Sequence, residues 1–167
     1  MEAILVMEGL FDLNIEQVLE NWSIADALRE IIANASDEQI LSNTASIEIS
    51  KDGSVWHIRD FGRGIQYFHF TQNENDEKAS STKLIGKFGV GLKDALAVLY
   101  RHKCDVVIDS KYNHITTKMA KKSGFDIQTL HADFTLSLNT NMVGTDFTIS
   151  GISDADMEDA KSRFLMI

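Results

Sequence analysis

The sequence predicts an α+β fold, a two-layer sandwich in which helices cover one face of a mostly antiparallel sheet. Two patterns predict it: apolar residues recur at three-and-four spacing in two segments, and period-two alternation marks shorter segments elsewhere in the chain. The chain has 167 residues, of which 44% are hydrophobic, and it contains no proline. Because this length can bury a sizeable core and no linker signature interrupts it, we expect a single domain over residues 1–167.

The first helix is expected to begin after Ser23, which together with Asp26 is typical of a helix start. Residues 1–22 form a short segment before this helix. Its apolar stripe makes it the most clearly patterned helix of the chain and consists of Ile24, Ala27, Leu28, Ile31, Ile32 and Ala35.

A β-hairpin is expected next. Apolar and polar residues alternate over residues 47–49 and again over residues 56–58, and Asp52-Gly53 between them is a hairpin-type turn. The pattern therefore predicts two antiparallel strands, of which the second ends at Asp60.

The remaining elements follow from the same patterns. A polar stretch without a sustained period occupies about residues 66–86, which is long for a loop and typical of a lid over a site. A second amphipathic helix, entered through glycines, is expected over residues 92–99. Strands are expected at residues 104–110, around Ile115, and at residues 125–130, 134–138 and 147–149, with a last helix at about residues 153–164.

The charge balance narrows the classes of function. Lys and Arg total 16 against 25 Asp and Glu, and the net charge of −9 disfavours direct nucleic-acid binding by this domain. No apolar run reaches the roughly 18 residues that span a bilayer, so we expect no membrane association. The single cysteine, Cys104, cannot form an internal disulfide, and the start Met1-Glu2 lacks the basic region of a secretory signal, so we expect a cytoplasmic protein.

Three polar residues lie beside the apolar stripe of the first helix. At 100° per residue, Asn34 lies about 40° and Asp37 about −20° from Glu30, so the pattern directs all three the same way. An acid and a carboxamide four residues apart could orient a water molecule and ligate a hard cation through oxygen. The alternative interpretation of the three residues is a solvated helix edge.

Two glycine-containing segments could hold parts of a ligand. In residues 60–64, the Asp60 carboxylate precedes two glycines and could accept a hydrogen bond from an exocyclic amine, although an ordinary tight turn would have the same pattern. Residues 86–93 place three glycines before a helix, where free N–H groups could bind phosphate. This segment matches neither the P-loop nor the G-x-G-x-x-G pattern, and the alternative is a flexible loop.

The order of these segments is specific. A helical Glu-x-x-x-Asn at residues 30–34 is followed by Asp-x-Gly-x-Gly at residues 60–64, the polar stretch, Gly-x-x-Gly-x-Gly at residues 86–91, and Gly144-Thr145 before a strand. Over roughly residues 23–149 the arrangement resembles the GHKL ATPase superfamily, which includes gyrase B, the ninety-kilodalton heat-shock chaperones, histidine kinases, MutL and MORC proteins. The second glycine segment is closest to that of MORC proteins.

The resemblance implies a Bergerat-type ATP-binding fold and a role for each matched residue. Glu30 matches the catalytic general base, and Asn34 matches the residue that coordinates magnesium together with the triphosphate. Asp60 matches the acid that hydrogen-bonds the adenine amino group. The other ATP-binding residues that the resemblance implies are Asp37, Gly62, Gly64, Ile65, Lys83, Gly86, Lys87, Phe88, Gly89, Val90, Gly91, Leu92, Lys93 and Thr145.

We therefore expect a magnesium-dependent domain that binds ATP and ADP, hydrolyses ATP slowly, and couples lid closure to self-association as a homodimer or to docking of another domain or subunit. Slow turnover is expected because gyrase-like and MutL-like members draw a catalytic lysine from a following domain. The alternatives are a non-hydrolysing nucleotide-sensing module and a histidine-kinase catalytic domain. A zinc site and a Ser-His-Asp hydrolase are unsupported, because the His and Cys spacing is irregular and no G-x-S-x-G occurs.

Overall fold

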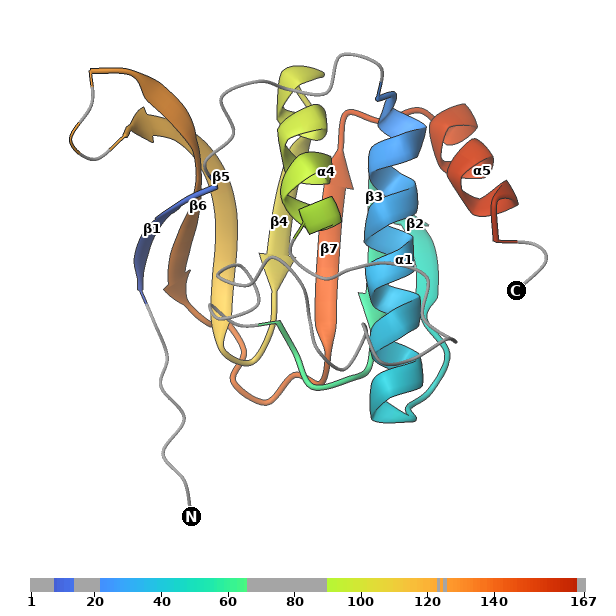
Figure 1. Ribbon diagram of the computed structural model, residues 1–167. Helices are drawn as coiled ribbons and strands as arrows, with labels where there is room; N and C mark the ends of the chain where they lie inside the picture. The colour runs from blue at the N-terminus through green and yellow to red at the C-terminus, as the bar shows by residue number, and fades with distance from the viewer. Residues whose placement is uncertain (1–7, 14–21, 66–89, 123, 125, 165–167) are drawn as a thin grey trace.

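Seven strands and three helices make up the part of the chain that the computed structural model describes, namely residues 8–13, 22–65, 90–122, 124 and 126–164 (Figure 1). None of these three helices is long and apolar enough to cross a bilayer. In chain order the elements are β1 (Gly9–Asp12), α1 (Ile24–Ser42), β2 (Glu48–Asp52), β3 (Val55–Asp60), α4 (Val90–Arg101), β4 (Asp105–Asp109), β5 (Asn113–Lys121), β6 (Gln128–Leu136), β7 (Thr145–Ser150) and α5 (Asp154–Ser162).

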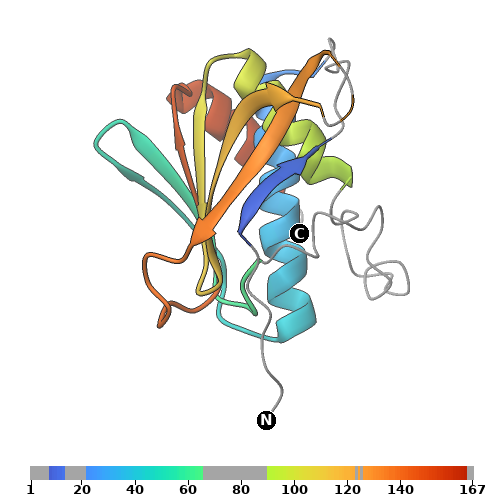
Figure 2. The same ribbon diagram turned by 90° about the vertical axis from the view of Figure 1, so that its left-hand side faces the viewer.

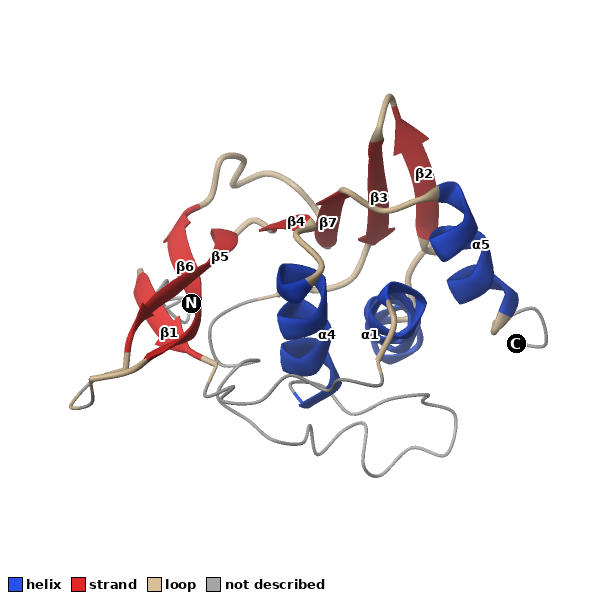
Figure 3. Ribbon diagram, turned by 90° about the horizontal axis from the view of Figure 1, so that it is seen from above, coloured by secondary structure: helices blue, strands red, loops and turns tan. Residues whose placement is uncertain are grey.

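The strands form one sheet in the order β1-β6-β5-β4-β7-β3-β2, and every neighbouring pair among them is antiparallel. The three helices lie on one side of this twisted sheet (Figures 2 and 3). The protein therefore has an α+β architecture of two layers. Strand β7 pairs with β3 on one side and with β4 on the other, so it connects the two halves of the sheet.

Helix α1 lies along the strands of the sheet, and both of its ends are fixed by its own sequence (Figure 1). Ser23 Oγ accepts a hydrogen bond from the Asp26 N–H (3.2 Å), and the Asp26 carboxylate accepts one from the Ser23 N–H (2.8 Å), which completes a capping box. At the other end, Asn43 adopts a left-handed conformation with φ of 51° and stops the helix. The predicted start of the helix is confirmed.

The hydrophobic core lies between the helices and the sheet. Helix α1 packs between α4 and α5 and against β3. Ile31 of α1, Leu96 of α4, Ile58 of β3 and Phe134 of β6 are at most 1% exposed. Each such side chain contributes roughly 1.5–3 kcal/mol by leaving water, so this packing holds α1 in a fixed position over the strands.

Strand alternation turns two polar residues toward the helix layer. In β3, Trp56 and Ile58 are buried in the core, and because side chains alternate along a strand, Asp60 shares their face. In β7, Phe147 is buried and Thr145 shares its face for the same reason. The polar ends of β3 and β7 therefore lie beneath α1 rather than in solvent.

The structure differs from the sequence pattern at two strands. Residues 9–12 form β1, although the pattern assigns no element to residues 1–22; four residues are too few to show alternation, and their pairing with β6 creates the strand. Residues 128–136 form the single strand β6, although the pattern predicts a break after residue 130. Because β6 has β1 on one side and β5 on the other, its backbone is paired through His131 and Asp133, where the polar side chains suggest a loop.

The other predicted elements agree with the structure, as far as it describes them. The hairpin over residues 47–60 is β2 and β3, with Gly53 at φ of 64° in its turn, and the predicted second helix lies within α4. The last helix is α5, which begins after a second capping box at Ser153. The predicted lid at about residues 66–86 lies outside the described residues.

Candidate functional site

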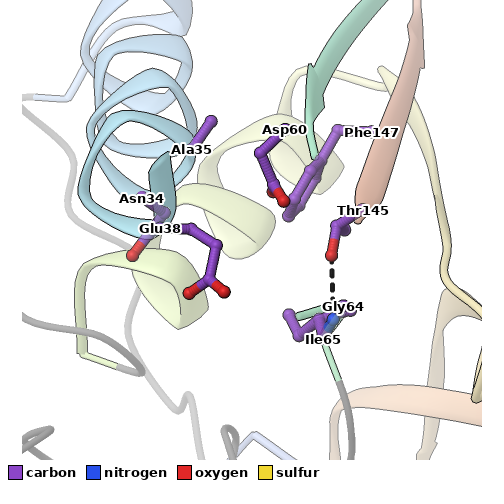
Figure 4. A pocket seen from close by; sticks show the side chains of 8 residues that line it. All are labelled: Asn34, Ala35, Glu38, Asp60, Gly64, Ile65, Thr145 and Phe147. Carbon is purple, nitrogen blue, oxygen red and sulfur yellow. Dashed lines mark hydrogen bonds between the residues drawn. The ribbon is translucent and has the colours of Figure 1, made fainter. Parts of the chain in front are cut away.

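A pocket forms where the ends of β3 and β7 meet helix α1. Asp60, the last residue of β3, pairs in register with Thr145, the first residue of β7. Asn34 and Glu38 approach from α1, and their side chains and that of Asp60 face the same space (Figure 4). The described residues that line this pocket are Asn34, Ala35, Glu38, Asp60, Gly64, Ile65, Thr145 and Phe147.

Asp60 is a buried carboxyl group at the base of the pocket. Its side chain accepts a hydrogen bond from the Gly62 N–H (3.0 Å), and the Thr145 N–H also hydrogen-bonds it. Burial first and the nearby charge of Glu38 second raise the pKa of Asp60, the hydrogen bonds from Gly62 and Thr145 lower it, and the net result is a pKa of about 6. Near neutral pH the ionised Asp60 carboxylate can therefore accept a hydrogen bond, and a small fall in pH would protonate it.

Glu38 is the second acid of the pocket, and Arg63 holds it in its ionised form. The carboxylate accepts hydrogen bonds from the Arg63 N–H (2.8 Å), Nε (3.0 Å) and Nη2 (3.1 Å) and from Ser42 Oγ (2.8 Å). Burial raises the pKa of Glu38, but these bonds and the Arg63 charge together lower it below its ordinary value. A side chain at Gly62 would collide with Glu38, so glycine is required where the turn passes beneath it.

Two hydroxyl groups hold the backbone that leaves this turn. The Ile65 N–H donates to Thr145 Oγ1 (2.8 Å), and Ser110 Oγ donates to the Ile65 carbonyl (2.7 Å). Gly64, just before, has φ of 87°, a conformation that favours glycine. Gly144 has φ of 79°, and a side chain there would collide with the Asp60 carbonyl. The rim of the pocket is therefore built from a closely fitted backbone.

Glu30 and Asn34 extend the site along α1 toward the start of α4. Asn34 is 5% exposed, and its Nδ2 donates to the Glu30 carbonyl (3.0 Å). Among the described residues, Glu30 does not line the pocket; its Oε1 accepts a hydrogen bond from Arg29 Nη1 (3.0 Å). Its Oε2 lies so close to the Gly91 Cα that any side chain at Gly91 would collide with it. The structure therefore joins the first helix to the second glycine segment at this carboxylate.

The other predicted site residues are placed as follows. Asp37 is fully buried in α1 and does not line the pocket, and Leu92 is fully buried in the core. Lys93 Nζ lies 5.5 Å from the centroid of the Phe11 ring, and burial lowers the pKa of Lys93. Val90 is described only as the first residue of α4. The predicted residues that lie outside the described part of the chain are Lys83, Gly86, Lys87, Phe88 and Gly89.

The sequence pattern does not single out three residues that build the site, namely Glu38, Arg63 and Ser110. Glu38 follows Asn34 by four residues and therefore shares its helix face, which is a signal that could have found it. Arg63 is the one cation within residues 60–64, and an acid on the buried side of a helix needs such a partner. Ser110 has no comparable signal, because its role depends on tertiary contact with Ile65.

The pocket is narrow compared with a second cavity. Its cavity volume is about 20 Å³, the room of about one water molecule. A planar ring would therefore enter from the mouth or displace side chains. A wider groove of about 500 Å³ lies between α1, β2 and α5, and its described lining contains no acid: Ile32, Ser36, Gln39, Ile40, Ile47, Ile49, Lys161 and Phe164. Convergent polar groups therefore favour the narrow pocket as the chemical site.

Comparison with known proteins gives a relative but no described activity. No family model matches the chain. The chain is 48% identical over 159 residues to an uncharacterized protein of Mycoplasma pneumoniae, an alignment that covers 92% of this chain and 64% of that protein. The chain thus spans somewhat less than two thirds of that relative's length, and the similarity identifies a related sequence without naming a substrate or a reaction.

Proposed function

We propose that this chain is a magnesium-dependent ATP-binding domain of the GHKL type, with a Bergerat-type fold, that hydrolyses ATP slowly. The observation that carries the proposal is the convergence of Asn34, Asp60 and Thr145, which come from three separate parts of the sequence, on one pocket. These are the residues to which the resemblance assigns the metal, the adenine amino group and the adenine-bound water. The antiparallel sheet with helices on one face is compatible with that fold.

The chemistry of Asp60 supports the adenine end. A buried carboxylate that keeps lone pairs toward a pocket is suited to accept a hydrogen bond from an exocyclic amine. Its pKa of about 6 leaves most of the group ionised at pH 7, so the acceptor form is available. Gly64 and Ile65 supply a rim on which the flat face of a base could lie, and the hydroxyls of Thr145 and Ser110 keep that rim fixed.

The contact between Glu30 and Gly91 supports the phosphate end. The start of α4 presents N–H groups and the positive end of the helix dipole, both of which favour phosphate. Glu30 would then lie beside the terminal phosphate, where a general base is needed. Among the described residues no group of three His, Cys, Asp or Glu side chains is placed to hold a metal ion, so magnesium would bind jointly to Asn34 and the phosphates.

One observation favours the alternative of a nucleotide-sensing module that does not hydrolyse ATP. Glu30 lies outside the pocket lining among the described residues, and Arg29 pairs with its Oε1. A carboxylate engaged in this way must use its other oxygen to activate water. Binding and turnover therefore have to be measured separately.

Calorimetric titration with ATP, with and without magnesium, tests the binding part of the proposal. We expect binding by the wild type and loss of binding by Asp60→Asn, because the amide would present a donor where the base needs an acceptor, at a cost of roughly 1–3 kcal/mol or more. Asp146→Asn is the matched control: Asp146 neighbours Thr145 on β7 but lies on the opposite face of the sheet. Equal affinities of wild type and Asp60→Asn would reject the adenine assignment.

Steady-state phosphate release tests the hydrolytic part. Glu30→Ala is expected to keep ATP affinity and to lower hydrolysis by about 10² to 10⁴, since a general base acts on the water rather than on binding. Glu158→Ala, which removes an exposed helical acid on α5, controls for the change in charge. ATP binding without any hydrolysis by the wild type would favour the sensing module instead.

The coupling of nucleotide binding to self-association or to docking of another domain rests on the resemblance alone. Sedimentation velocity with and without a non-hydrolysable ATP analogue measures it. A larger sedimenting species only with the analogue is the expected result, and identical profiles would remove self-association from the proposal.

A further inference from the structure

Arg29 connects the end of α5 to the carboxylate of Glu30. Its Nη1 donates to Glu30 Oε1 at 3.0 Å, and its guanidinium carbon lies 5.9 Å from the centroid of the Phe164 ring, which follows α5. The Arg29 side chain is 36% exposed and that of Glu30 is 17% exposed. The guanidinium is thus held between an acid of the candidate site and an aromatic ring more than 130 residues later in the chain.

This arrangement fixes which oxygen of Glu30 faces the start of α4. Because Arg29 engages Oε1, the carboxylate cannot turn freely, and its Oε2 lies against the Cα of Gly91. A base that presents one defined oxygen has a large advantage over a base that rotates, since small errors of position lower rates strongly. Arg29 thus orients the Glu30 carboxylate, although it is not among the described residues that line the pocket.

Phe164 in turn restrains Arg29. An arginine on a helix surface samples many rotamers, and a cation over an aromatic face is favoured over those alternatives. The ring is partly buried against the core and also lines the groove between α1, β2 and α5. Packing of the ring on the core therefore fixes its position beside the guanidinium.

We propose that Arg29 and Phe164 are positioning residues for Glu30: the end of α5 holds the guanidinium, and the guanidinium orients the carboxylate. The inference rests on the proposed ATPase function. It adds that residues at the end of α5, the last described helix, influence the same site. It predicts an effect on turnover and none on nucleotide affinity.

A second contact of α5 provides a matched control. Arg163 Nη1 binds Asp26 Oδ1 at 2.7 Å, so this neighbour of Phe164 also ties the end of α5 to α1. Among the described residues, Arg163 forms its ion pairs with Asp26 and Asp159, so its variant loosens α5 without acting on the base. It separates a specific path from general weakening of the helix contact.

The experiment measures kcat and KM for ATP in the 167-residue protein and five variants. Arg29→Met should lower kcat about tenfold with KM unchanged, because misplacing a base affects the reaction more than binding. Phe164→Leu should lower kcat about two- to fivefold, and Phe164→Tyr should restore it, since a tyrosine ring keeps the cation contact. Arg163→Met should leave kcat unchanged. The double variant Arg29→Met/Phe164→Leu should be no slower than Arg29→Met, because the ring acts only through the arginine.

Each other outcome overturns the inference. A rise of kcat in Arg29→Met would mean that the guanidinium restrains the base rather than orienting it. Unchanged kcat in Arg29→Met and Phe164→Leu, with normal hydrolysis by the wild type, would refute the positioning role and leave the ATPase proposal standing. Equal losses in Phe164→Leu and Arg163→Met would assign the effect to α5 docking in general. Absence of ATP hydrolysis by the wild type would overturn both proposals together.

Discussion

Replacement of Asp60 by asparagine should help stability more at alkaline pH than at acid pH, when the variant is compared with the wild type. The folded protein holds this carboxyl at a pKa of about 6, against an ordinary value of 3.8, chiefly because it is buried. Between these two pH values the folded state keeps a proton that the unfolded state has lost. The contribution of Asp60 to stability is therefore most favourable below pH 3.8, falls as the pH rises through about 6, and stays low above it.

The magnitude follows from the size of the shift. A difference of about 2 pKa units at about 1.36 kcal/mol each means that the ionised Asp60 costs the fold about 3 kcal/mol at pH 8. An asparagine avoids this cost, but it has a single oxygen to accept from the Gly62 and Thr145 N–H groups, which both donate to the carboxylate now, and loss of one of these bonds costs about 1–3 kcal/mol. That second cost does not depend on pH. The free energy of unfolding of Asp60→Asn, relative to that of the wild type, should therefore rise by about 2 kcal/mol from pH 4 to pH 8.

Urea unfolding followed by tryptophan fluorescence at pH 4 and pH 8 measures this difference. Asp126→Asn is the control, because the Asp126 side chain is fully exposed and its replacement should change stability little at either pH value. If Asp60→Asn also changes stability equally at pH 4 and pH 8, then Asp60 does not carry a raised pKa, and the reasoning about its burial is wrong.

Three further outcomes are expected. ATP affinity should fall about tenfold per pH unit below pH 6, because only the ionised Asp60 accepts the adenine amine, and calorimetry at pH 5, 6 and 7 measures this fall. Gly144→Ala should cost about 2–4 kcal/mol of unfolding free energy, because it combines a φ of 79° with a collision, whereas Gly53→Ala, at φ of 64° with open space, should cost about 1 kcal/mol; equal losses in denaturant melts would contradict this. Arg63→Met should destabilise the fold by about 1–3 kcal/mol at pH 7 and by less at pH 4, since the pKa of Glu38 is lowered by a partnership that protonation removes; a loss that grows toward pH 4 would count against it.

Local signals in the sequence account for the elements that were predicted correctly. Ser23 and Asp26 form the capping box that their identities and spacing indicate, and Gly53 occupies the left-handed turn of the β2–β3 hairpin. Alternation also places Asp60 on the buried face of β3, because Trp56 and Ile58 occupy that face. In each case the information lies within a few residues along the chain.

The rest depends on partners that are distant in the sequence. Strand β1 exists because Gly9 pairs with Phe134, and four residues carry no period of their own. In the sequence, Glu38 has the pattern of a solvated acid at a helix edge. Only the fold brings Arg63, 25 positions later, into hydrogen-bond distance of it. The prediction directs Glu30, Asn34 and Asp37 to one place, whereas Asn34 lines the pocket, Asp37 is buried outside its lining and Glu30 lies against Gly91. Helix periodicity gives the direction in which each side chain points, but it does not tell which residues the side chain meets in that direction.

The place of β7 in the sheet has a consequence for the order of assembly during synthesis. Residues 145–150 are the last of the described strands to leave the ribosome, yet they separate β3 from β4 in the sheet. Until they emerge, the β2–β3 hairpin cannot pair with the strands β4, β5 and β6. Each of these two parts of the sheet then exposes unpaired backbone that chaperones or other nascent chains can engage. Since Thr145 begins this strand, the pocket around Asp60 closes only at that late moment. Translation pauses that occur before residues 145–150 have left the ribosome would therefore prolong the vulnerable period, whereas later pauses would not.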